Sequence, residues 1–262
     1  MKIQLKATKH RARSKSGALR IPGLIAHEIG VQILSGEIRS GDTLNGEIET
    51  SDKLQVSRAA YREAVRILAA KGLVTALRKI GTRVTPQEEW HLLDPDVLGW
   101  LFESDPAEEL LSNLFELRRI VEPEAAALAA QRHSERDLQE MAGALDKMSR
   151  YGLESRAGQL ADQAFHAALL RASRNVFIAS LTTGVGAAVR WTTIYKRIHS
   201  SHLRDSVPDH RRVYDAISRR DVISARRAMV GLVDLALQDT KKVARKARSE
   251  GKRESRANGK QR

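Results

Sequence analysis

Apolar residues recur every three or four positions throughout the second half of the chain, which is the spacing of one face of an α-helix. In the first such segment the repeating residues are Leu110, Leu114, Leu117, Val121, Ala125 and Leu128. Pro123 falls inside this repeat, where a proline should kink the helix or mark a break. Further helices are predicted at about residues 135–149, 154–172, 175–199, 203–219 and 221–247. No alternating apolar pattern typical of a strand follows residue 85, so residues 107–243 are predicted to form an antiparallel helical bundle.

The N-terminal pattern differs, because short helical repeats are followed by two strand-like runs. The first predicted helix carries Leu24 to Ile33 and ends near Ser35, and a second, short helix spans Glu47–Leu54. A third helix opens on Ser57, a good N-cap residue, and closes on Gly72, which suits a left-handed C-terminal cap. Two strand-like runs with a basic turn then fill residues 73–84. Three helices and a hairpin within residues 21–85 match a winged helix-turn-helix in order and size, so the chain is predicted to be mainly α-helical with two domains.

Residues 86–106 are predicted to be the linker between these domains. Proline punctuates the segment, and Trp90 and Trp100 lie at the two ends of its apolar centre. Two tryptophans in a linker indicate that it packs against another part of the chain. At its end, Asp105, Pro106 and Glu108 have the spacing of a capping box that would start the first helix of the bundle.

The third helix carries a cationic stripe, since Arg58, Arg62 and Arg66 are spaced four residues apart. Arginine near the N-terminus of a helix fits the major groove of DNA, and the basic turn Arg78-Lys79 could reach the neighbouring backbone or minor groove. The alternative is an ordinary solvent-exposed charged face. The preceding helices and the following hairpin favour DNA binding.

The charge of the chain favours a polyanionic partner. The formal net charge is +13, and the excess lies at the two ends, where residues 1–20 contain no acid. Residues 1–20 and 244–262 lack the apolar groups needed for a core and are predicted to be basic disordered arms. The absence of cysteine suits a reducing cytoplasm, where we expect the protein to act. No apolar run is long enough to span a bilayer, and the basic N-terminus lacks the apolar stretch of a signal peptide, so no membrane partner is expected.

The chemistry of the bundle is concentrated in a few polar side chains. Asp162 and His166 lie four residues apart on one helix face, a spacing that allows both to bind one metal ion, and His210 on a later helix offers a third ligand. On spacing alone, these residues could equally be ordinary hydrogen-bonded core or surface residues. A metal-dependent hydrolase would use the same triad, but no separate acid, base or nucleophile accompanies it.

The N-terminal motifs resemble the DNA-binding domain of the GntR-type bacterial transcription regulators. The resemblance rests on four segments: Ile33–Leu44, Val56–Arg58, Arg62–Ala64 and Gly81–Val84. It implies that Ser57, Arg58 and Arg62 contact operator bases and phosphates, and that Arg78 and Lys79 at the wing tip reach the neighbouring groove. This chain departs from the family pattern at three positions: Ile48 replaces an arginine that often touches DNA, Thr50 replaces a leucine, and Tyr61 replaces a small β-branched residue. These departures bear on the operator sequence more than on DNA binding itself.

The C-terminal motifs resemble the FCD domain of the FadR branch of that family, an all-helical bundle that senses a ligand and dimerises. The resemblance rests on Glu116–Ala126, Asp162–His166, Ala172–Asn175 and the segment from His210 onward. Many such domains hold a divalent metal through one Asp and three His. Asp162, His166 and His210 match the first three positions, but the fourth is Leu232, which cannot bind a metal. The resemblance therefore implies either a weakly held or effector-assisted ion such as Zn, Ni or Mn, or direct binding of the effector by the three residues.

Two more residues are candidates for effector binding. Arg118 shares a helix face with Leu111, Leu114 and Glu122, so it can point into the bundle, and a guanidinium binds a carboxylate bidentately. The resemblance also places an effector-contacting arginine there. The alternative for Arg118 is an ion pair with Glu122. Trp191 is a candidate pocket wall, although a buried tryptophan is more often part of a core.

These observations predict a ligand-responsive transcription regulator, a repressor that binds double-stranded operator DNA as a homodimer. A two-fold protein reads a two-fold site. The connector resembles that of regulators responding to sugar acids such as galactonate, so a small acidic metabolite is the expected effector. The alternatives are the metal-dependent hydrolase and a nucleoid-type DNA binder without sequence preference, whose affinity would collapse with salt.

Overall fold

The structure is a computed structural model that describes residues 21–77, 80–200 and 203–258. The chain divides into two compact units between Pro106 and Ala107. Each unit has its own hydrophobic core. None of the helices described is both long and apolar enough to cross a membrane.

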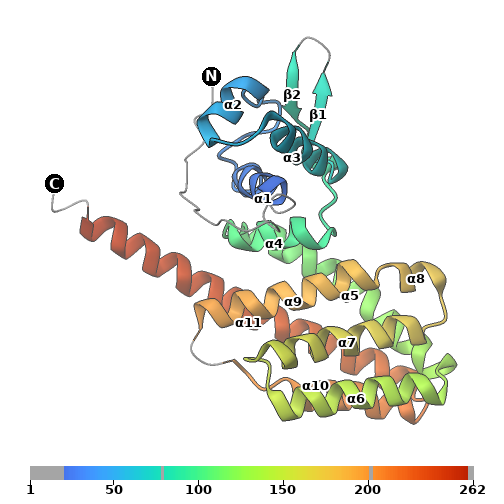
Figure 1. Cartoon of the computed structure of the whole chain (residues 1–262). Coiled ribbons are helices and arrows are strands. Elements are labelled where there is room, and N and C mark those ends of the chain that lie inside the picture. Colours follow the sequence, from blue (N-terminus) through green and yellow to red (C-terminus); the bar gives the residue numbers. More distant parts are fainter. Residues whose placement is uncertain (1–20, 78–79, 201–202, 259–262) are drawn as a thin grey trace. The chain divides into compact units, whose positions relative to one another are not determined.

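The first unit contains the predicted three helices and hairpin (Figure 1). Its elements are α1 (Ile21–Leu34), α2 (Glu47–Leu54), α3 (Arg58–Ala70), β1 (Val74–Leu77) and β2 (Gly81–Val84). The two strands are antiparallel, with Val74 opposite Val84 and Leu77 opposite Gly81. The prediction of a winged helix-turn-helix is thus confirmed.

Both predicted caps of α3 are present. The Ser57 hydroxyl accepts a hydrogen bond from the backbone N–H of Ala60 at 3.1 Å. Gly72 has a φ of +74°, and a Cβ there would lie 2.0 Å from the carbonyl oxygen of Glu89. Only glycine fits this left-handed, closely approached position without strain. The cap directs the chain from α3 into the hairpin.

The segment after the hairpin packs into the first unit, as its tryptophans indicated. It contains the 3₁₀ turn η1 (Gln87–Glu89) and helix α4 (Pro95–Glu103), whose Trp100 belongs to the core around α1. The Trp100 ring lies so close to Gly30 that a Cβ on Gly30 would be 2.3 Å from it. Asp94 caps α4 and pairs with Lys71 at 2.7 Å.

The second unit is the predicted helical bundle, and its core is built from apolar residues of several helices, with Phe115, Met141 and Phe165 among the largest. Its helices are α5 (Glu108–Arg132), α6 (Glu135–Tyr151), α7 (Arg156–Ala172), α8 (Val176–Ser180), α9 (Thr182–His199), α10 (Val207–Ser218) and α11 (Val222–Asn258). The predicted fold class is confirmed. Pro123 lies inside α5 without ending it.

The ends of three helices differ from prediction. The capping box at Asp105 does not form: Asp105 has a φ of +53°, and α5 begins at Glu108 after Ala107, without a side-chain cap. The helix expected at 175–199 is two helices, which break at Leu181. An apolar repeat does not reveal such a break, because both helices contribute apolar residues.

Helix α11 continues to Asn258, past residue 244, where the sequence predicted a disordered tail. The continuation has local support, because Ala244 is buried and Arg245 pairs with Glu108 at 2.9 Å. The prediction of disorder rested on the small number of apolar residues in this segment. Amino-acid composition cannot show that Ala244 becomes buried or that Arg245 pairs with Glu108. The predicted arm at residues 1–20 and the last residues of the tail, 259–262, lie outside the described residues.

We predict that Gly72→Ala lowers the free energy of unfolding by about 1–3 kcal/mol, because alanine is strained at this φ and its Cβ would meet the Glu89 carbonyl. Gly23→Ala is the matched control, since α1 leaves open space at Gly23. It should be neutral or stabilising by about 0.4–1 kcal/mol. Chemical denaturation of both variants measures the difference. Equal stability would contradict the assigned role of Gly72.

Candidate functional site

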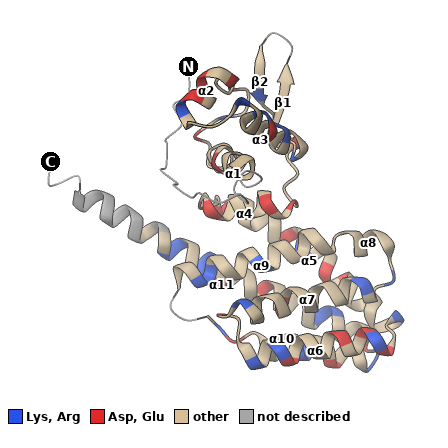
Figure 2. Cartoon of the chain, viewed as in Figure 1, with Lys and Arg blue, Asp and Glu red and all other residues tan. Residues whose placement is uncertain are grey.

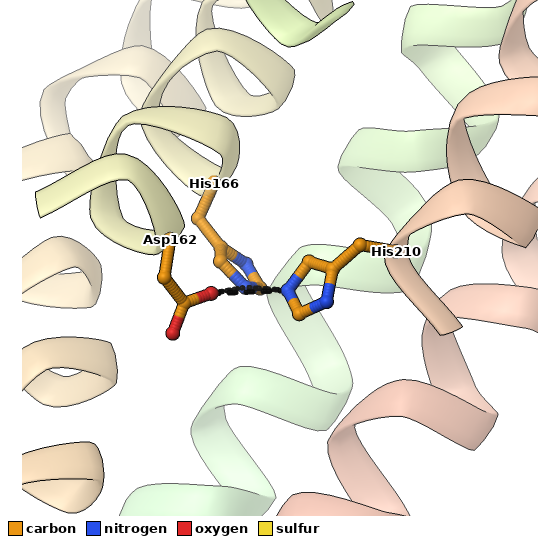
Figure 3. Close-up of side chains that lie close together, drawn as sticks. All are labelled: Asp162, His166 and His210. Atoms are coloured by element: carbon orange, nitrogen blue, oxygen red, sulfur yellow. Dashed lines mark hydrogen bonds and ion pairs between the residues drawn. The ribbon is translucent and has the colours of Figure 1, made fainter. Parts of the chain in front are cut away.

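Two helices bring the predicted triad together in the interior of the bundle (Figure 3). Asp162 and His166 lie on α7, and His210 lies on α10. Asp162 Oδ1 is 3.0 Å from His210 Nε2 and 3.6 Å from His166 Nε2, and the two Nε2 atoms are 3.3 Å apart. All three side chains are buried.

The outer nitrogen of each imidazole faces a hydrogen-bond acceptor. His210 Nδ1 lies 2.8 Å from the backbone carbonyl of Ser206, and His166 Nδ1 contacts the Glu122 carboxylate. An N–H that donates to such an acceptor fixes the tautomer of a neutral imidazole. Both Nε2 atoms are then left with lone pairs directed toward Asp162.

In these tautomers, lone pairs of three atoms converge on one point. Asp162 Oδ1 is buried, 3.0 Å from His210 Nε2 and 3.6 Å from His166 Nε2. Burial by itself would raise the pKa of Asp162, but protonated His210 and His166 beside it lower that pKa. A positive charge among the three atoms, from a proton on an imidazole or from a metal ion, therefore stabilises the cluster.

The spacing of the three atoms suits a small divalent metal ion. A triangle with sides of 3.0, 3.3 and 3.6 Å has a circumscribed radius of about 1.9 Å, close to the ~2.0–2.2 Å bonds that zinc forms with nitrogen and oxygen. Imidazole and carboxylate together suit Zn, Ni or Mn. Leu232, at the position where the family resemblance implies a fourth ligand, is buried and lines the same cavity. Three protein ligands leave coordination positions open.

Arg118 combines the two roles that the sequence left as alternatives. Its Nε donates to Glu122 Oε1 at 2.6 Å, its guanidinium carbon lies 5.1 Å from the centre of the Phe115 ring, and the residue also lines the cavity. Burial would raise the pKa of Glu122, but Arg118 and His166 lower it to about 2. Among the described residues, none accepts a hydrogen bond from the terminal nitrogens of Arg118, which are therefore available to an anion.

The sequence missed several residues of this cavity and misplaced one. Residues of α9 (Val189, Thr192, Thr193 and Lys196) and Arg204 from the following loop line it. Trp191 is not in the lining; it is half-buried and stacks with Arg190, whose guanidinium is 5.4 Å from the ring centre. The 3–4 spacing of the α9 residues was the signal for the inward face, and Trp191 is one position off it. No sequence pattern pointed to Arg204.

Of the predicted DNA-contacting residues, Arg58 and Arg62 lie on α3, and Figure 2 colours the basic residues of this helix blue. Ser57 caps the helix, and Arg58 is exposed. The side chains of Arg62 and Arg66 are 62% and 78% exposed, although Arg62 pairs with Glu47 at 3.8 Å. Arg78 and Lys79 lie outside the described residues.

The three residues that depart from the family pattern differ in their exposure: Thr50 and Tyr61 are buried, and Ile48 is exposed. The buried Tyr61 hydroxyl donates to the Asn45 carbonyl at 3.1 Å, and the buried Thr50 hydroxyl donates to the same carbonyl at 3.3 Å. These two residues hold α2 and α3 together. Ile48 is 57% exposed on α2, so of the three it is the one available to DNA.

Each of the two units matches a known protein family. Residues 24–84 match the bacterial regulatory proteins of the gntR family, and residues 113–235 match the FCD domain. The chain is 29% identical to the galactonate operon transcriptional repressor of Escherichia coli K12 over 82% of its own length and 94% of the relative. It is 31% identical to the E. coli K12 HTH-type regulator YieP, over 80% of the chain and 91% of the relative.

The chain belongs to the GntR family. Regulators of this family bind DNA, and their FCD domains bind small-molecule effectors and typically dimerise. The protein is therefore a transcription regulator and not an enzyme, which removes the hydrolase alternative. A solved structure of Lar, which controls the agr system of Listeria monocytogenes, shares the fold, with a TM-score of 0.59, 16% identity and coverage of 89% of this chain and 99% of that one.

The incomplete ligand set of this GntR-family regulator leads to a prediction for Leu232→His. An added imidazole should raise metal affinity, and a chelator should then lower the thermal stability of the variant more than that of the parent. The metal-free variant should lose about 1–2 kcal/mol of stability through poorer packing. Elemental analysis and thermal denaturation measure both effects. Leu232→Met keeps the apolar character and serves as the control; metal content near zero in all three proteins would contradict a metal at this site.

Proposed function

We propose that this regulator is a repressor that leaves its operator when a small carboxylate of the sugar-acid type enters the cavity of the bundle. The main support is the convergence of Asp162, His166 and His210 beside the free terminal nitrogens of Arg118. A bound divalent cation would supply positive charge and open coordination positions there. The likeness to the galactonate operon repressor favours both repression and this ligand class.

In this proposal each residue of the site has a defined task. Asp162, His166 and His210 would hold the ion, and Glu122 would keep His166 in the tautomer that offers Nε2. Glu122 would also orient Arg118, whose terminal nitrogens match the two oxygens of a carboxylate. If no metal is bound, the same three residues and Arg118 would contact the effector directly.

The response requires two states of a dimer that differ in their affinity for the effector. A ligand that binds both states equally shifts nothing. We propose that the homodimer presents two copies of α3 to a two-fold operator, and that the effector favours a geometry in which the two helices no longer fit both half-sites. Ser57, Arg58 and Arg62 would make the operator contacts, with Arg78 and Lys79 at the wing tip.

For DNA binding, we predict that Arg58→Ala and Arg62→Ala each weaken specific operator binding by roughly 1–3 kcal/mol while leaving stability nearly unchanged. Arg150→Ala, which removes an exposed arginine from α6, is the matched control. Fluorescence anisotropy with operator and scrambled DNA at several salt concentrations measures the effect. If neither α3 variant loses operator affinity, the recognition-helix assignment is wrong. If the parent protein does not distinguish operator from scrambled DNA, the nucleoid-type alternative holds.

For effector binding, we predict that a sugar acid raises the thermal stability of the metal-loaded full-length chain and releases it from operator DNA. Arg118→Lys should greatly weaken both effects, because it keeps a cation beside Glu122 but removes the planar guanidinium that would bind the carboxylate bidentately. Dialysis against a chelator should greatly reduce them. If the chelated protein responds as strongly as the loaded one, the effector is bound without a metal. If no sugar acid changes stability or operator binding in either form, the proposed ligand class is wrong.

A further inference from the structure

The cavity at the triad is too small to hold a sugar acid on its own. Its volume is about 30 Å³, far below the roughly 300–1,000 Å³ of ordinary small-molecule sites. A second hollow of about 280 Å³ shares several lining residues with it, namely Leu153, Thr193, Lys196, Arg204 and Asp239. The two are therefore contiguous. A ligand whose carboxylate reaches Arg118 must extend past these shared residues into the outer hollow.

Lys196 is half-buried at this junction, and its ammonium differs from the neighbouring cations in having no ionic partner within the described part of the chain. Arg118 has Glu122 as its partner, and Arg204 binds both Asp209 and Asp239. The side-chain ammonium of Lys196 makes no hydrogen bond or ion pair with any residue that the structure describes. Burial lowers its pKa, although the charges of Asp162 and Asp239 oppose this effect.

The outer hollow beyond Lys196 is lined by further basic groups. His199 and Lys242 contribute to its wall. Among the described residues of this lining, Asp239 is the one acid, and it is already held by Arg204 at 2.9 Å. Positive charge therefore faces the part of a ligand that lies farthest from Arg118.

We infer that the effector carries two acidic groups, of which Arg118 and the triad bind the first and Lys196 binds the second. This inference rests on the proposed function and narrows its ligand class to a sugar-sized acid with an anionic group at each end, either a dicarboxylate or a phosphorylated sugar acid. A divalent ion held by one carboxylate keeps one surplus positive charge, and Lys196 adds another. A dianion neutralises both.

A monoanion of the same size would place a neutral hydroxyl beside the ammonium of Lys196. A hydroxyl accepts a hydrogen bond from the ammonium but leaves its charge unbalanced, whereas a second acidic group both accepts the bond and neutralises the charge. A half-buried cation whose charge the ligand does not balance keeps a part of its desolvation cost. Lys196 is thus a specificity-determining residue that selects against ligands with a single acidic group.

Matched ligand pairs test the inference. Galactonate and galactarate differ only in the group at the far end of the chain, a hydroxymethyl in one and a carboxylate in the other. Calorimetry on the metal-loaded full-length protein should show galactarate binding at least about tenfold more tightly. Gluconate and 6-phosphogluconate form the second pair, and they distinguish a phosphate from a second carboxylate as the preferred group.

Variants at Lys196 show whether this residue, and not the rest of the site, causes the preference for a second acidic group. Lys196→Met should bind the monoanion and the dianion of the preferred pair equally, whereas Lys196→Arg should keep the preference. Lys147→Met, on the exposed face of α6, is the matched control and should behave as the parent. Thermal denaturation of each variant shows whether it is folded.

The outcomes distinguish the inference from the proposed function. If monoanions bind the parent as tightly as dianions in both pairs, the inference fails while the proposed function stands. A preference for dianions that persists in a folded Lys196→Met variant overturns the assignment to Lys196. If none of the four acids binds or releases operator DNA, the inference fails together with the proposed sugar-acid class.

Discussion

The buried carboxylate of Glu122 is the interaction on which the rest of the site depends. It is fully buried, and it contacts Arg118 on one side and His166 on the other. An isolated carboxylate in such a place would be very costly, so its two cationic or proton-donating neighbours are a requirement for folding as well as for function. By satisfying Glu122, the chain fixes the tautomer of His166 and the orientation of Arg118 at once. The cavity is therefore organised before any ligand enters it.

Most of the fold follows from patterns that a sequence shows directly. The helical repeats, the Ser57 cap and the left-handed Gly72 define the first unit, and the apolar repeats from α5 onward define the bundle. These features are local, so residues three or four positions apart determine them. The break between α8 and α9 and the extension of α11 depend on contacts between distant segments, such as Arg245 with Glu108, and the sequence alone did not predict them.

The residues of the candidate site also fall into two groups: those that local spacing in the sequence indicated, and those that only tertiary packing brings to the cavity. Asp162 and His166 share a helix, so their spacing was informative, whereas His210 comes from α10 and was offered as a third ligand without any spacing to support it, until the family resemblance added that support. Trp191 was proposed for its chemistry without regard to its helical phase, and Lys196, which has the correct phase, was missed. Arg204 follows α9 in a loop, where no periodicity applies. Tertiary packing brings it to the cavity through Asp209 and Asp239.

Leu232 stands where the family resemblance implies a fourth metal ligand, and this replacement has a consequence for how a metal and an effector would bind. A complete set of four protein ligands would hold a metal tightly whether or not an effector were present, whereas three leave positions that an effector carboxylate can complete. Metal and effector affinities are then coupled, and by linkage each raises the other by the same factor. In the proposed site, a leucine at this position would lower the affinity for the metal alone and make occupancy by the pair depend on the effector. In such a site the weak metal affinity itself increases the response to the ligand, because the fully loaded state forms only when both components are present.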